Sequence, residues 1–177
     1  MEEQGIAGLD AVVAVEPPLR ARTPVFGHLG LTGTFRTKLE ANGRLVIPAA
    51  LRSPYVTLGA GQLLVVDTAL WLFTYRSFEL NVEALVSENA DLLPEDHRTL
   101  LYNASFEAGV DKQARIVVPP ELRRQVEFEG EQEIVVTGSV DHVEIWGAEE
   151  WDRDRAPAVN QAGLAFKRRR TLPTGGA

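Results

Sequence analysis

The sequence contains an internal repeat with a spacing of 71 residues, and this repeat constrains the fold more than any other feature. Residues 34–75 align without a gap with residues 105–146. The densest stretch reads EANGRLVIPAALR in the first copy and DKQARIVVPPELR in the second. Solenoids generally need three or more units. Two copies therefore predict one pseudo-twofold domain, or a pair of interlocked half-domains.

Each copy predicts strands joined by short turns. A first strand (34–39; 105–110) leads through a turn into a short β-branched strand (44–47; 115–118) that a proline ends. That proline suits the start of a short helix carrying Leu51 or Leu122. An apolar strand (63–66; 134–137) and a fourth strand follow. We expect a mainly β fold with helices, of the α+β class.

The remaining segments differ from the repeats in composition. Residues 77–103 predict helix divided by Pro94, while the two ends of the chain are rich in small residues, Pro and Gly. We predict an N-terminal extension (1–30), a first repeat (31–80), a helical connector (81–103), a second repeat (104–155) and a basic C-terminal tail (156–177). Both terminal segments are expected to be disordered.

Several kinds of chemistry lack the residues they need. The chain has no cysteine, which excludes disulfides and thiolate nucleophiles, and its three histidines have no ligand spacing. It has no glycine-rich phosphate loop and no nucleophile elbow. No apolar run approaches the roughly 20 residues that a membrane helix requires. We predict a cytoplasmic protein that is not an enzyme, with no metal, cofactor, membrane partner or small-molecule substrate.

Charge is distributed unevenly along the chain, whose formal net charge is -7. Residues 28–52 carry a local net charge of +3, and residues 103–124 carry +1. Residues 125–155, with ten acids and two arginines, carry -8. Because a groove responds to local potential, the acidic total does not exclude binding to nucleic acid.

The repeated turns pair an acid with an arginine four residues later, Glu40 with Arg44 and Asp111 with Arg115. These pairs are either ion pairs that close each turn or acids that orient an arginine toward DNA, and both can hold. The Asn-Gly at 42–43 is a strong two-residue hairpin signal, whereas the Gln-Ala at 113–114 is not. Either the two turns differ, or neither is a simple type I′ turn.

The duplicated acid-x-x-x-Arg motif, followed by an aliphatic strand, Pro and Leu-Arg, resembles the MraZ family of bacterial DNA-binding regulators, which are related to the AbrB and MazE swapped-hairpin proteins. The resemblance covers residues 26–151. It implies a double-split β-barrel of two intertwined halves and ring-shaped homo-oligomers. It also implies nucleoid-associated binding to repeated DNA boxes upstream of a division and cell-wall gene cluster. Glu40 and Ala114 depart from the family pattern, which has Asp and usually Gly at these positions.

The resemblance and the charge pattern predict the residues of a double-stranded DNA interface. We expect Arg44 to read a base edge, guanine by preference, while Arg36 and Lys38 hold phosphates. Arg115 with Lys112 plays the same part or serves the ring interface. The candidate DNA-binding residues are Arg44, Arg36, Lys38, Asn42, Arg115 and Lys112, and the orienting acids are Glu40 and Asp111. The competing hypothesis is a self-assembling or protein-binding module, antitoxin-like or structural, without specific DNA binding.

Overall fold

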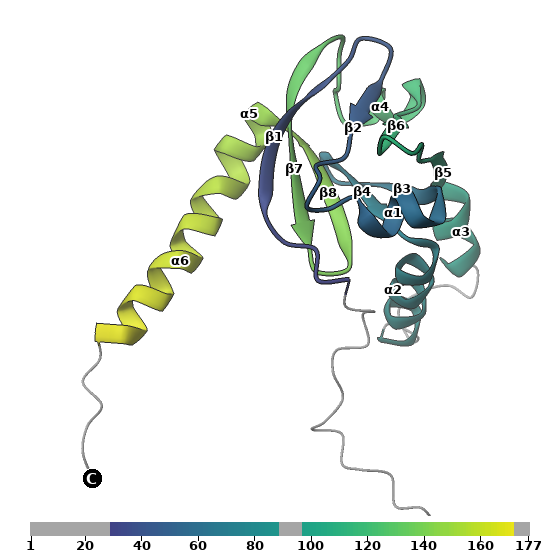
Figure 1. Cartoon of the computed structure of the whole chain (residues 1–177). Helices are drawn as coiled ribbons and strands as arrows, with labels where there is room; N and C mark the ends of the chain where they lie inside the picture. The colour runs from purple at the N-terminus through teal and green to yellow at the C-terminus, as the bar shows by residue number, and fades with distance from the viewer. Residues whose placement is uncertain (1–28, 89–96, 172–177) are drawn as a thin grey trace, which may run out of the picture.

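The computed structural model describes residues 29–88 and 97–171, which form an antiparallel eight-stranded sheet with helices around it (Figure 1). The order of the strands is β5-β3-β4-β8-β7-β1-β2-β6. A tight turn joins the two edge strands, so the sheet curls into a nearly closed barrel. The strands are β1 (Thr34–Leu39), β2 (Arg44–Val46), β3 (Ala60–Val66), β4 (Ala69–Phe73), β5 (Phe106–Gly109), β6 (Arg115–Val117), β7 (Gln132–Ser139) and β8 (His142–Gly147).

The helices connect the strands and extend the chain beyond the barrel. Short helices follow β2 and β6, a longer pair lies between the repeats, and three consecutive segments follow β8. These elements are α1 (Ser53–Leu58), α2 (Tyr75–Glu88), α3 (His97–Ala104), α4 (Pro120–Gln125), α5 (Ala148–Glu150), the π-helix η2 (Trp151–Arg155) and α6 (Ala156–Thr171). In the described part of the chain, no helix has both the length and the apolarity needed to cross a membrane.

The two repeats exchange strands. The strand β1 of the first repeat pairs with β7 of the second, and β5 of the second pairs with β3 of the first. At the centre of the β2–β6 pair, Leu45 lies opposite Ile116, and in the β4–β8 pair Leu72 lies opposite Val143. Both pairs join residues that are 71 apart, so the pseudo-twofold axis passes through them. The interlocked arrangement and the α+β barrel are therefore confirmed.

The core lies inside this barrel and draws on both repeats. Leu45 and Ile116 are about 1% exposed, and Leu63 and Ile134 are fully buried. Tyr55 of α1 is also buried, where its hydroxyl donates a 2.7 Å hydrogen bond to the Leu72 carbonyl. Because apolar side chains from both copies fill one interior, neither repeat has a separate core.

The two repeated turns have the same backbone geometry, and neither is of type I′. In the first, the Gly43 N–H donates to the Glu40 carbonyl and only Gly43 has a positive φ, of 83°. In the second, the Ala114 N–H donates to the Asp111 carbonyl and Ala114 has a φ of 62°. A type I turn followed by one left-handed residue makes this three-residue hairpin loop. Ala114 accepts a conformation that glycine would adopt at less cost.

Several element boundaries differ from those expected. Leu51 precedes α1 instead of lying within it, and α2 continues through the predicted boundary at residue 80. Residues 156–171, expected to be disordered, form α6, which extends away from the barrel in Figure 1. Pro94, most of the N-terminal extension and residues 172–177 lie outside the described residues.

Candidate nucleic-acid interface

The strands β2 and β6 form a two-stranded antiparallel ribbon whose two faces differ in character. Leu45 and Ile116 point into the core, as the burial of both shows. Alternate residues of a strand point to opposite faces, so the outer face carries Arg44, Val46, Arg115 and Val117. Arg44 pairs with Val117, and Val46 pairs with Arg115. We call these four residues the ribbon face.

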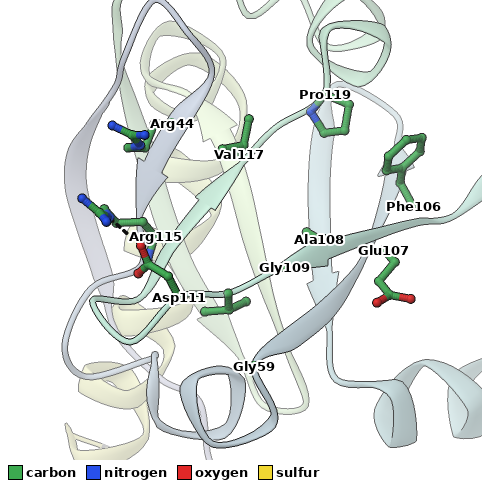
Figure 2. Close-up of a pocket in the computed structure, with 11 residues that line it drawn as sticks. Arg44, Gly59, Phe106, Glu107, Ala108, Gly109, Asp111, Arg115, Val117 and Pro119 are labelled. Atoms are coloured by element: carbon green, nitrogen blue, oxygen red, sulfur yellow. Dashed lines mark hydrogen bonds and ion pairs between the residues drawn. The ribbon is translucent and has the colours of Figure 1, made fainter.

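The two arginines of the ribbon face point in the same direction, as Figure 2 shows. Their side chains are 42% and 38% exposed, so both can reach a ligand. They line a groove of about 550 Å³ together with Asp111, Phe106 and Val117. The exchange of strands therefore brings together two arginines that are 71 residues apart in the sequence.

The second turn holds its arginine firmly. One carboxylate oxygen of Asp111 accepts hydrogen bonds from the backbone N–H groups of Gln113 (2.8 Å) and Arg115 (3.0 Å). The other accepts a 2.6 Å bond from Nε of Arg115. These bonds from Arg115 and Gln113 lower the pKa of Asp111 below its usual value. Arg115 is thus oriented while its two Nη groups keep donors for another partner.

The first turn holds its arginine more loosely. The carboxylate of Glu40 is 3.8 Å from Nη1 of Arg44, which is an ion-pair distance and not a good hydrogen bond. Here the side-chain oxygen of Asn42 accepts the Arg44 N–H at 2.9 Å, as one oxygen of Asp111 does in the other turn. A structural ion pair is therefore present in both turns, and Arg44 keeps more freedom than Arg115.

Arg123 supports the first turn, a role that was not predicted from the sequence. Arg123 of α4 donates a 3.1 Å hydrogen bond from Nη1 to the Ala41 carbonyl. A Cβ atom at Gly43 would lie 2.6 Å from the Val118 carbonyl oxygen and 3.1 Å from Nε of Arg123. The first turn is therefore braced by the second repeat. The repeated Leu-Arg motif was the available signal, but it could not show which backbone group the arginine meets.

The remaining predicted DNA-binding residues lie outside the ribbon face. Arg36 of β1 contacts Asp152 (2.5 Å) and Glu133 (2.9 Å), and these acids raise its pKa. Lys38, on the same strand, lies 3.6 Å from Glu131. Lys112 is exposed in the second turn. A phosphate would have to compete with these carboxylates for Arg36 and Lys38. Among the described residues, Lys112 has no acid within ion-pair distance.

A separate polar cluster lies where the β7–β8 hairpin meets α2. Asp141 contacts Nδ1 of His142 at 2.8 Å and accepts a 2.6 Å bond from Asn81. The His142 ring stacks against both Trp71 and Phe73, with centroid distances of 4.3 and 4.8 Å. Its partners are side chains of the fold, which gives the cluster a structural role. Over residues 29–88 and 97–171, no three His, Asp or Glu side chains are grouped to hold a metal ion.

The sequence of the chain is similar to those of known proteins. A family described as "MraZ protein, putative antitoxin-like" matches residues 101–171. The Transcriptional regulator MraZ of Desulforamulus reducens is 35% identical over 134 residues, covering 71% of this chain and 87% of the relative. The chain belongs to the MraZ family.

Other members of the MraZ family align over a similar span. The Transcriptional regulator MraZ of Desulforapulum autotrophicum is 34% identical over 118 residues, covering 66% of this chain and 79% of that protein. The protein of the same name from Lactiplantibacillus plantarum is 32% identical over 137 residues, covering 75% and 94%. These relatives are named as regulators of transcription, which is not a class of enzyme.

Proposed function

We propose that this member of the MraZ family is a transcriptional regulator that binds double-stranded DNA through the ribbon face. The observation that carries the proposal is the placement of Arg44 and Arg115 on one exposed face of a two-stranded antiparallel ribbon. Such a ribbon fits the major groove, where arginine makes two hydrogen bonds to the O6 and N7 atoms of guanine.

The two arginines have different roles in this proposal. Arg44, held by one loose ion pair, adjusts to a guanine edge and reads it. Arg115, oriented by Asp111, reads a second base or contacts the neighbouring subunit. Asn42 and Lys112 lie in the turns on either side and contact the backbone of the DNA. Arg36 and Lys38 bind phosphate only where DNA displaces Glu133, Asp152 and Glu131.

The same proposal includes a ring of subunits in the cytoplasm, associated with the nucleoid. Two features favour contact with a second copy. An apolar groove of about 580 Å³ lies between the barrel and α2, lined by Leu64, Trp71, Phe78 and Val82 among others. On α6, Val159 and Leu164 are 54% and 52% exposed. A ring would place several ribbon faces on repeated boxes, and weak contacts would add up as avidity. Following the family resemblance, the proposed target is a division and cell-wall gene cluster.

The test is an anisotropy titration on DNA from upstream of that cluster, with the full chain and an Arg44→Ala variant. We expect the substitution to weaken binding roughly 10- to 100-fold and to relax base preference at one position, because a bidentate contact is lost. Arg76→Ala is the matched control, since Arg76 is an exposed arginine of α2 paired with Glu79 and lies outside the ribbon face. Equal affinity of Arg44→Ala and the unsubstituted chain would contradict the proposal.

One observation favours the second candidate, a protein-binding or self-assembling module. The Asp111–Arg115 contact of 2.6 Å satisfies part of the guanidinium without any ligand. If both arginines served only to close the turns, the chain would form oligomers but would ignore every duplex at moderate salt. The same titration at about 150 mM salt separates the two candidates, because charge attraction alone is weak there.

A further inference from the structure

The ribbon face carries two exposed valines that the fold does not require. Val46 is 43% exposed and Val117 is 54% exposed, whereas the core is served by the opposite face of the same strands. Exposed positions of the neighbouring strand β1 are polar instead: Thr34, Arg36 and Lys38. Strand propensity explains β-branched residues, but Thr offers that propensity with a polar group. The apolar surface between the two arginines is therefore available to a partner that offers apolar atoms.

Position on the ribbon limits which partner can cover the valines. Each valine lies directly opposite an arginine, with Val117 facing Arg44 and Val46 facing Arg115. Opposite residues of an antiparallel pair have Cβ atoms about 5 Å apart. An apolar protein surface that covered the valines would also remove the water from both guanidinium groups, at considerable cost unless acceptors replaced it. The partner must therefore offer apolar atoms and hydrogen-bond acceptors side by side.

The major groove of DNA offers this combination. Guanine presents two acceptors there, and thymine presents its C5 methyl group next to an acceptor, O4. Successive base pairs are about 3.4 Å apart along the axis. Residues two apart on a strand are separated by about 6.6 Å, so a valine reaches a base within about two pairs of the guanine.

We propose that Val46 and Val117 are specificity-determining residues that contact thymine methyl groups within two base pairs of the guanines read by Arg44 and Arg115. The inference rests on the proposed function and deepens it. Each strand of the ribbon then supplies one arginine that hydrogen-bonds to a base and one valine that contacts a methyl group. The pseudo-twofold axis makes the pairs equivalent, so a guanine and its neighbouring thymine form the unit of recognition.

Deoxyuridine provides a sharp test, because it pairs as thymidine does and lacks only the C5 methyl group. The probes are duplexes selected by the full chain from a random pool, with each thymine near a guanine replaced in turn by deoxyuridine. We expect the unsubstituted chain to bind roughly three- to fivefold more weakly for each contacted methyl that is removed. Val117→Ala and Val46→Ala should each lose this discrimination at one position and bind the two duplexes equally.

Val140→Ala is the matched control, since this valine is 44% exposed in the turn between β7 and β8, outside the ribbon, and the variant should keep the full discrimination. Val117→Thr, which keeps one methyl group and the strand propensity, should discriminate partly, and thermal melting followed by circular dichroism checks that each variant folds. Equal binding of thymine and uracil duplexes by the unsubstituted chain would overturn the inference while leaving DNA binding intact. Failure to select any duplex would overturn both this inference and the proposed function.

Discussion

At the scale of single residues, small differences between the repeats decide how each arginine is held. Asp111 is short enough to accept two backbone N–H groups and the Arg115 side chain together. Glu40 has one more methylene group, and Asn42 takes over the contact with the Arg44 N–H. The side chain of Arg115 is therefore held more firmly than that of Arg44, although the two turns are of the same type.

Glu144 is the acid whose environment matters most for stability. Burial raises its pKa, but the nearby His142, a 2.8 Å bond from Nε1 of Trp146 and the charge of Arg155 outweigh that effect and lower the pKa to about 2. A lowered pKa stabilises the fold at pH values above the ordinary value of 4.5, and this contribution is lost as the pH falls toward 2.

We therefore predict that Glu144→Gln lowers the free energy of unfolding at pH 7 by about 3 kcal/mol, from the size of the pKa shift. The difference between the two proteins should shrink as the pH falls from 4.5 to 2, measured by urea unfolding at several pH values. Glu83→Gln is the control, because the exposed pair of Glu83 with Arg98, 3.5 Å apart, should contribute less than about 1 kcal/mol. A Glu144→Gln variant as stable as the original chain would contradict the assignment.

Among the structural elements, the turn between β1 and β2 packs directly against the other repeat. The Val118 N–H donates to the Gly43 carbonyl, and the Ile47 N–H donates to the Ala114 carbonyl, both at 2.8 Å. Each turn thus meets the end of the other repeat's short strand. These bonds fix the β2–β6 ribbon, which has only three residues in each strand.

Substitution of the turn glycine should show this close approach. Gly43→Ala places a Cβ 2.6 Å from the Val118 carbonyl oxygen and also forces alanine to a φ of 83°. Gly59→Ala is the matched control, with a φ of 70° and no atom within 4 Å of the new Cβ. We expect the control to lose about 1 kcal/mol of stability and Gly43→Ala to lose clearly more, measured by thermal or urea unfolding. Equal losses would mean that the turns are not packed together.

At the scale of the whole molecule, the exchange of strands makes the two repeats one cooperative unit. The first repeat's β1 and β3 pair with β7 and β5 of the second, and β2 pairs with β6. Ion pairs also join the two repeats, since Arg36 and Lys38 of the first repeat contact acids of the second. The acidic segment 125–155 therefore neutralises the cations of β1 and leaves the arginines of the ribbon face exposed.

We predict that a cavity in one repeat destabilises both. Leu45→Ala removes a buried side chain on the pseudo-twofold axis and should cost about 2–5 kcal/mol. In native-state hydrogen exchange, the amides of β2 and β6 should then become less protected by the same amount, because their hydrogen bonds open together. Faster exchange confined to the first repeat would show that the halves open separately.

The amino-acid sequence alone establishes the repeat, the short β-branched strands ended by proline, the acid–arginine turns and the absence of thiol chemistry. These follow from local patterns, since alternation, turn residues and composition can be read within a few residues. The sequence could not show how firmly each acid holds its arginine, because one methylene at position 40 and the neighbouring Asn42 set the distance.

Which residues lie side by side depends on how the two repeats fold together. Strand pairing across 71 residues places Arg44 beside Val117 and Arg115 beside Val46, and it ties Arg36 to Glu133 and Asp152. Such contacts depend on which strands pair with each other. Burial of the shared core determines that pairing, and local strand propensity does not. For that reason the basic residues of β1, grouped with Arg44 in the sequence, lie outside the ribbon face in the fold.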